Sequence, residues 1–120
     1  MEKWLADLVG VRYVTGGKTP AEGFDCATLC TYIQRYRGLL EFPWNPFAWR
    51  RYCEWIPKGS ILQKYDAILY TPSQGYGMSH VAIVIDEFDI IHANHYADSV
   101  VISRLRNSAY SKAARFSDKK

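Results

Sequence analysis

"GFDCATLC", residues 23–30, decides how the amino-terminal part of the chain folds. The stretch before it, residues 15–23, is dense in glycine and also contains proline, which predicts a loop. Asp25 can then accept hydrogen bonds from the first free backbone N–H groups of a helix. The residues that follow place an apolar stripe at helical spacing: Cys26, Leu29, Cys30 and Ile33. We therefore predict a helix that begins at Cys26 and ends near Gly38.

The place of Cys26 at the start of this helix bears on its chemistry. Unpaired backbone N–H groups and the helix dipole stabilise negative charge there, which favours thiolate over thiol. Cys30 lies one turn further along the same stripe and Cys53 lies among bulky aromatic residues, so both are interpreted as packing residues. Because free cysteine is among the most buried residue types, Cys26 alone fits a nucleophile and a core residue equally well. A base close to the thiol would favour the nucleophile over the core residue.

The composition and charge indicate the number of domains and exclude some classes of partner. A chain of 120 residues, 48% hydrophobic and 22% charged, predicts a single globular domain over residues 1–120. The net charge of +3 is dispersed, so we expect no nucleic-acid partner. No stretch approaches the roughly 18 apolar residues of a membrane span. Glu2 and Asp7 interrupt the start of the chain, so we expect no signal peptide, no membrane partner and synthesis in the cytoplasm.

Helical patterns come first in the chain and strand patterns follow. Residues 2–9 predict a short amphipathic helix that stops at Gly10. Residues 42–57 combine three prolines with three tryptophans, which predicts an irregular or briefly helical segment instead of a strand. Four strands follow, separated by a Gly-containing loop and short turns, over residues 66–71, 80–86, 89–93 and 99–105. The predicted fold class is α+β, with the helix of Cys26 packed on an antiparallel sheet.

Three histidines could supply the base: His80, His92 and His95. Side chains on two paired antiparallel strands share a face according to the register of the turn that joins them. An even register places His80 and His92 on one face, whereas an odd register sets His80 against His95. We prefer the even register because it gathers an apolar set on the opposite face: Val81, Ile83, Ile85 and Ile91.

A nucleophile, a base and a group that orients the base are the parts needed to activate a thiol. Cys26, His80 and His92 can fill these roles in that order. Taken singly, His80 also fits an ordinary strand-edge histidine and His92 a strand cap. Zinc binding is the other use of these residue types, but a C-x3-C pair on one helix lacks the second pair that zinc sites use. We expect no metal and no cofactor.

Four segments resemble one known family in order. "VRYVTGGKTPAEGFDCATL", residues 11–29, resembles the Y-x-x-G-G and D-C-S-G-L pattern of the NlpC-type cell-wall cysteine peptidases. The later segments resemble that family's G-D-x-V-x-F, S-H-V-G-I-Y and V-I-H-A patterns: "YDAILY" (65–70), "SHVAIVID" (79–86) and "IIHA" (90–93). The resemblance covers the chain from about Gly10 to Ala93.

The resemblance implies a papain-like α+β fold and hydrolysis of peptide bonds in peptidoglycan stem peptides, commonly the bond between D-glutamate and a diamino acid. It implies catalytic roles for Cys26 as nucleophile, His80 as base and His92 as orienting residue. It implies substrate-binding roles for Tyr13, as a polar partner beside the thiolate, and for Asp25 and Ser79, which would line the pocket for the amino end of the stem.

The chain departs from the family pattern at three positions. Ala27 and Thr28 replace the usual Ser-Gly after the cysteine, and Tyr65 replaces the usual glycine before an aspartate, so the cleavage specificity stays open. Residues 16–26 resemble small phage-tail members, which implies a virion-associated enzyme with other tail proteins as partners. Two alternatives remain: an acyltransferase on the same thiol, and a catalytically relict wall-binding tail protein that contacts its target through residues 44–55.

Overall fold

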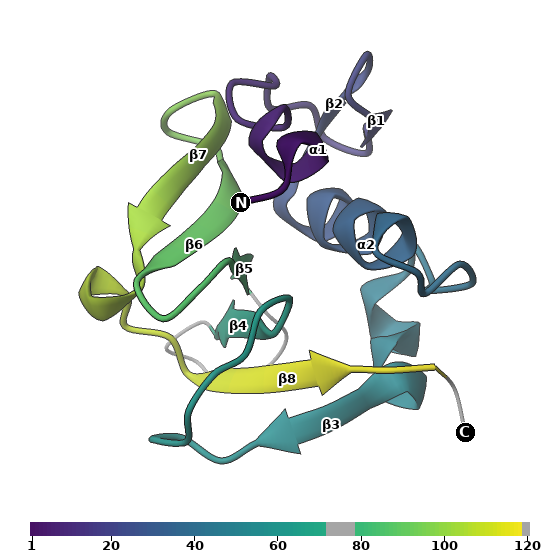
Figure 1. Ribbon diagram of the computed structural model, residues 1–120. Helices are drawn as coiled ribbons and strands as arrows, with labels where there is room; N and C mark the ends of the chain where they lie inside the picture. Colours follow the sequence, from purple (N-terminus) through teal and green to yellow (C-terminus); the bar gives the residue numbers. More distant parts are fainter. Residues whose placement is uncertain (72–78, 119–120) are drawn as a thin grey trace.

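A six-stranded antiparallel sheet curves around one helix, α2 (Cys26–Tyr36), in the computed structural model, which describes residues 1–71 and 79–118 (Figure 1). The strands lie in the order β3-β8-β4-β5-β6-β7. Their bounds are β3 (Cys53–Ile56), β4 (Ala67–Tyr70), β5 (His80–Val84), β6 (Asp89–Asn94), β7 (Ser99–Arg104) and β8 (Lys112–Phe116). The predicted α+β class is therefore confirmed.

The start of α2 is closed by a reciprocal pair of hydrogen bonds. The Thr28 backbone N–H donates to Asp25 Oδ1 and the Asp25 backbone N–H donates to Thr28 Oγ1, each at 2.9 Å. The helix ends before Gly38, whose φ of 129° suits a residue without a side chain. Three residues of the predicted apolar stripe are buried in the main core: Leu29, Cys30 and Ile33. The helix predicted from Cys26 to near Gly38 is confirmed.

The loop predicted over residues 15–23 contains a small hairpin instead. Its strands are β1 (Lys18–Thr19) and β2 (Gly23–Phe24), and each has two residues, too few for a period in the sequence. The hairpin closes tightly, because a Cβ on Gly17 would lie 2.2 Å from the Gly23 carbonyl oxygen. Phe24 forms a bridge with Tyr13, and this brings the tyrosine next to the start of α2.

Strands β4 to β7 form the predicted antiparallel meander. The Gly-containing loop expected between the first two strands lies mostly outside the described residues. Between β5 and β6, Ile83 opposes Ile91, so the preferred even register is confirmed. The apolar set expected on one face packs with α2 in the main core: Val81, Ile83, Ile85 and Ile91. The other face carries a smaller apolar cluster: Ile56, Ile68, Ala82, Val84, Ile90 and Ala113.

Two strands of the six-stranded sheet, β3 and β8, were not predicted, and the expectation that residues 42–57 form no strand was wrong. Residues 42–57, expected to form no strand, contain the 3-10 helix η1 (Pro46–Tyr52) followed by β3. β8 lies between β3 and β4 and hydrogen-bonds to both. Its buried positions include Ala113 and Ala114, small residues that give little strand signal in a sequence.

The amino-terminal helix is shorter than predicted. α1 spans Lys3–Ala6, and a turn carries the chain to Gly10, whose backbone N–H donates to the Val100 carbonyl. Leu5 and Leu8 are buried, as the pattern predicted, but Val9 is exposed. None of the helices in residues 1–71 and 79–118 has the length and apolar character to cross a membrane.

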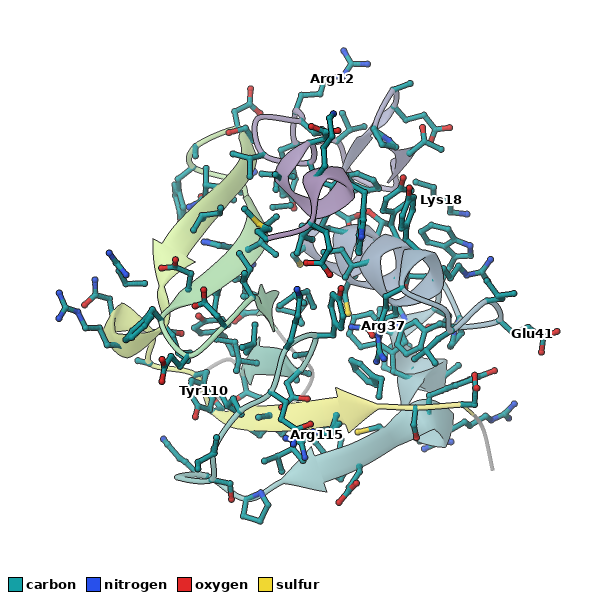
Figure 2. The ribbon with its side chains drawn as sticks, in the orientation of Figure 1. Arg12, Lys18, Arg37, Glu41, Tyr110 and Arg115 are labelled. Atoms are coloured by element: carbon teal, nitrogen blue, oxygen red, sulfur yellow. The ribbon has the colours of Figure 1, made fainter. Side chains whose placement is uncertain are left out.

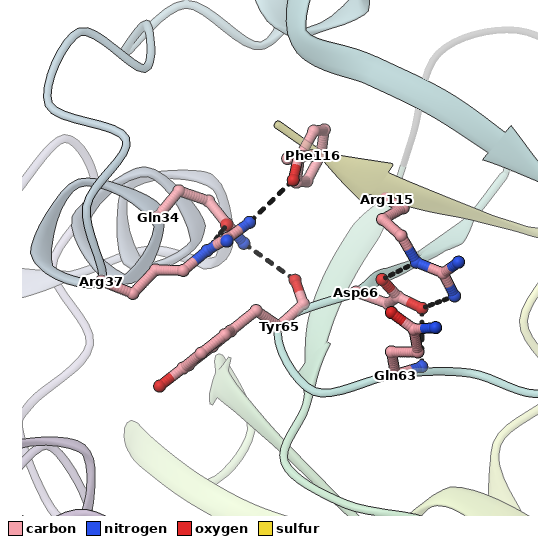
Figure 3. A network of polar contacts seen from close by, with 7 residues as sticks. All are labelled: Gln34, Arg37, Gln63, Tyr65, Asp66, Arg115 and Phe116. Atoms are coloured by element: carbon pink, nitrogen blue, oxygen red, sulfur yellow. Dashed lines mark hydrogen bonds and ion pairs between the residues drawn. The ribbon is translucent and has the colours of Figure 1, made fainter. Parts of the chain in front are cut away.

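A buried polar network ties the far end of α2 to the sheet (Figure 3). Gln34 Nε2 donates to the Tyr65 carbonyl at 3.0 Å, and Arg37 donates to Gln34 Oε1 and to the Phe116 carbonyl. Tyr65 has a φ of 74°, in the left-handed region that favours the glycine it replaces. Its hydroxyl donates to Glu2, so side-chain contacts hold this backbone in place.

Asp66 is the most buried charge of that network. Its carboxylate accepts hydrogen bonds from Arg115 Nε at 3.0 Å and Nη2 at 2.8 Å, and from the Gln63 backbone N–H at 2.7 Å. The Asp66 carboxylate is therefore paired and fully hydrogen-bonded, as a buried charge must be.

In Figure 2 the side chains of Arg12, Lys18 and Glu41 project from the rim, whereas Arg37 and Arg115 lie among other side chains.

Candidate active site

A cavity of about 550 Å³ opens where α2 starts, β5 starts and β6 ends. It is lined by Tyr13, Cys26, Ser79, His80, His92, Ala93, Asn94, His95 and Tyr96. Five of the six residues predicted for the site therefore lie on one cavity. The sixth, Asp25, is not among its lining residues. Cys26, Cys30 and Cys53 are all free thiols, and only Cys26 lines this cavity.

The two predicted imidazoles are in direct contact. His80 Nε2 lies 2.8 Å from His92 Nδ1, and the rings meet at 75° with centroids 5.0 Å apart. This contact follows from the even register, which puts positions 80 and 92 on one face of the sheet. His95 does not take the place of His92. It packs edge-on against Tyr13 instead, with centroids 5.4 Å apart.

The thiol and the first imidazole share the cavity without a bond between them. Among the described residues, Cys26 makes no hydrogen bond to His80, a contact that is often long before substrate binds. His80 Nδ1 likewise has no hydrogen-bond partner in the described part of the chain, because Nε2 is the nitrogen that contacts His92. One nitrogen of this ring is thus held, and the other is available.

Ser103 extends the chain of contacts beyond the predicted residues. Its Oγ lies 2.9 Å from His92 Nε2. On β7, Val101 is the residue directly opposite His92, so Ser103 is its diagonal neighbour on the same face. The sequence could have indicated this contact only if the β6–β7 register had been known.

Burial decides the protonation of the site. It raises the pKa of Cys26, although hydrogen bonding to the Val81 backbone N–H acts in the opposite direction. Burial, and then the proximity of His92, lower the pKa of His80 to about 4. Burial also lowers the pKa of His92. The resting site is therefore a neutral thiol beside neutral imidazoles, which is opposite to the thiolate expected from the helix start.

The remaining predicted residues divide into two kinds. Burial, followed by the proximity of the Cys26 thiol and the Asp25 carboxylate, raises the pKa of Tyr13, so its hydroxyl keeps its proton and can donate. Asp25 is occupied by backbone groups, since Oδ1 accepts from Thr28 and Oδ2 accepts from the Gly16 N–H at 2.8 Å. Thr28, one of the departures from the family pattern, is therefore part of the helix cap.

A helix that starts with a cysteine, packed on an antiparallel sheet that carries two contacting histidines, defines a papain-like α+β domain. The chain belongs to the NlpC/P60 family, whose model matches residues 10–117. The resemblance seen in the sequence is thereby confirmed.

Relatives of known name and structure agree with this assignment. The chain is 30% identical over 97 residues to the gamma-DL-glutamyl hydrolase of Bacillus subtilis (strain 168), covering 81% of this chain and 23% of that protein's length. An NlpC/P60 family protein from Bacillus cereus ATCC 10987 superposes with a TM-score of 0.75 at 30% identity, over 91% of this chain and 36% of that one. The NlpC/p60 domain of the peptidoglycan hydrolase SagA has the same fold, with a TM-score of 0.70 at 23% identity over 92% of both chains.

Proposed function

We propose that this protein is a cysteine hydrolase that cuts amide bonds in peptidoglycan stem peptides. Cys26 is the nucleophile, His80 the general base, and His92 the residue that orients the base. The observation that carries the proposal is that all three line one cavity, with the two imidazole nitrogens 2.8 Å apart. Membership of the NlpC/P60 family supports the same chemistry.

The neutral resting state sets the order of the first step. As the Cys26 sulfur attacks the carbonyl carbon, its proton moves to His80 Nδ1, and the carbonyl electron pair moves to the oxygen. Backbone N–H groups at the start of α2 hold the resulting oxyanion. When the intermediate collapses, the C–N bond breaks and the leaving amine takes the proton from His80. Water, deprotonated by His80, then attacks the thioester carbonyl. The C–S bond breaks, the carboxylic acid leaves, and His80 returns the proton to the Cys26 sulfur.

The bond that we propose is a γ-glutamyl amide, such as the bond between D-glutamate and a diamino acid of the stem. The name of the Bacillus subtilis relative supports this choice. Tyr13 and Ser79 line the same cavity and would bind the substrate, with the Tyr13 hydroxyl as a donor. Asp25 contributes by holding the loop at Gly16 against the start of α2.

Digestion of purified wall fragments tests the proposal. The protein should release new free amino groups from fragments that contain D-glutamyl-diamino acid bonds, and mass spectrometry of the products should locate the cut at that bond. Cys26→Ala is the matched control and should release none. If wild type and Cys26→Ala leave all diamino-acid types of wall intact while both bind them, the protein is a wall-binding component and the proposal fails.

Delivery of the enzyme by a phage tail stays a prediction. It depends on the resemblance of residues 16–26 to small phage-tail members of the family. Mass spectrometry of purified virions would test it, and finding the protein only in the lysate would count against it.

A further inference from the structure

We propose that Ser103 is a positioning residue of this site, which holds the His92 ring so that Nδ1 faces His80. The inference rests on the proposed role of His80 as general base. Ser103 lies on β7, outside the four short motifs quoted from the sequence, and it does not line the cavity that contains Cys26. It acts on the reacting groups only through His92.

The geometry places two hydrogen bonds in series. His80 Nε2 lies 2.8 Å from His92 Nδ1, and His92 Nε2 lies 2.9 Å from Ser103 Oγ. A base at His80 must keep the Nδ1 lone pair free, so its ring proton is on Nε2 and is donated to His92 Nδ1. The His92 proton is then on Nε2, where Ser103 Oγ accepts it.

The two contacts together select one orientation of the His92 ring. A rotation of the imidazole by 180° would exchange each nitrogen with a carbon, so the rotated ring would present carbon both to His80 and to Ser103. With both partners in place the rotated ring loses two hydrogen bonds, and without Ser103 it loses only one. The serine therefore increases the fraction of molecules in which His80 is held for catalysis.

The surroundings of Ser103 suit this role. His92 also lines a second cavity, of about 340 Å³, together with Tyr70, Ser103, Arg104 and Ser108. Ser103 is half-buried there, so its own O–H can donate to solvent while Oγ accepts from His92. Without the hydroxyl, this side of the ring would face the cavity with no partner among the described residues.

The experiment compares Ser103→Ala, Ser103→Thr and Ser99→Ala. Thr keeps the hydroxyl and suits a strand. Ser99 is the matched control, because it lies on the same strand, has an odd-numbered position like Ser103, and makes no side-chain hydrogen bond within the described part of the chain. The first readout is the NMR signal of the imidazole N–H shared by His80 and His92. The second is kcat and KM on wall fragments.

Ser103→Ala should broaden or abolish the shared N–H signal and lower kcat roughly 10-fold with KM unchanged. Ser103→Thr and Ser99→Ala should keep both. The inference is overturned if Ser103→Ala retains the signal and the kcat of the parent, if Thr does no better than Ala, or if Ser99→Ala loses as much. The NMR readout needs no turnover, so loss of the signal in a protein that cuts no wall would leave the positioning role standing and defeat only the proposed hydrolysis.

Discussion

The two ends of α2 carry polar clusters of opposite character. At the start of the helix, a free thiol and two half-buried imidazoles line an open cavity, and burial shifts their pKa values toward the neutral forms. At the far end, Asp66 has 2% of its side chain exposed, and its carboxylate accepts three hydrogen bonds. One end keeps groups with free capacity to react, and the other satisfies its groups completely. Changes at the first end should therefore alter activity, and changes at the second should alter stability.

The largest expected effect is on activity, from Cys26→Ala. Removal of the proposed nucleophile should lower wall-fragment cleavage by at least about 10³-fold. The melting temperature should stay within about 3 °C of the parent, because the thiol is only half-buried and its removal leaves the helix cap in place. Cleavage assays and thermal unfolding check the two parts. A variant that unfolds would assign Cys26 to the core and remove the contrast between the ends.

Substitutions at the two histidines should lower kcat by different amounts. His80→Ala removes the proposed base and should lower kcat about 10³-fold, within the range for general-base catalysis. His92→Asn retains one group able to hydrogen-bond His80 and should lower kcat only about 10- to 100-fold. Steady-state kinetics of both variants, beside circular dichroism as a folding control, measure the difference. Equal losses in both would mean that orientation and proton transfer are not divided between them as proposed.

Substitution at the far end of α2 should lower stability and leave activity unchanged. Asp66→Asn breaks a bidentate contact with Arg115, whose side chain is 30% exposed, and should lower the free energy of unfolding by about 2–4 kcal/mol. The folded fraction should keep its specific activity. Asp89→Asn is the matched control, because its ion pair with Arg104 lies on the surface and should cost less than about 1 kcal/mol. Urea unfolding compares the two. A loss of specific activity at constant stability in Asp66→Asn would contradict the division.

Acid should destabilise the protein through the protonation of His80, near the start of α2. An unfolded histidine takes up a proton near pH 6.5, whereas folded His80 does so only near pH 4, so the unfolded state binds more protons between these values. The stability that neutral His80 contributes is complete above about pH 6.5 and is lost as the pH falls toward 4, by about 1–2 kcal/mol because the ring is partly exposed to solvent.

Urea unfolding at several pH values tests this window. His80→Gln should flatten the dependence between pH 6.5 and 4 relative to the parent protein. A parent protein whose stability is constant across the window would show that burial does not set the protonation of His80.

The smallest expected effect is on thiol labelling. Cys26 faces an open cavity, Cys30 has no exposed surface, and burial raises the pKa of Cys53 to about 11. At pH 8, iodoacetamide should therefore modify Cys26 roughly 10-fold faster than either of the others. Peptide mapping after timed quenching measures the ratio. Equal rates at all three would count against an accessible nucleophile at the start of α2.

The contrast also explains which features could be predicted from the sequence. Helical spacing and an aspartate cap locate the start of α2, and the parity of His80 and His92 with the apolar residues between them indicates the strand register. These signals are local. The burial that lowers the pKa of His80 depends on the packed domain, so the sequence predicted a thiolate where the structure has a neutral thiol.

Contacts between distant segments account for the other failures. β3 and β8 pair residues 53–56 with residues 113–116. Neither strand has enough alternating apolar residues to be predicted from the sequence. Ser103 shows no pattern in the sequence, because its importance depends on the register of β7 against β6. The Asp25 cap was predicted and is confirmed, but the reciprocal role of Thr28 was not predicted, because threonine stands in the capping box in place of the usual acidic or amide residue.

The position of β8 has a consequence for how the chain is made. β3 and β4 follow each other in the sequence, but β8 separates them in the sheet, and β3 pairs with β8 alone among the described strands. On a ribosome, β3 therefore emerges long before its partner, with its hydrogen-bonding edge and the aromatic partners of Phe116 left open. The nascent chain can assemble the meander first, but the sheet closes only after residues 112–116 have left the exit tunnel.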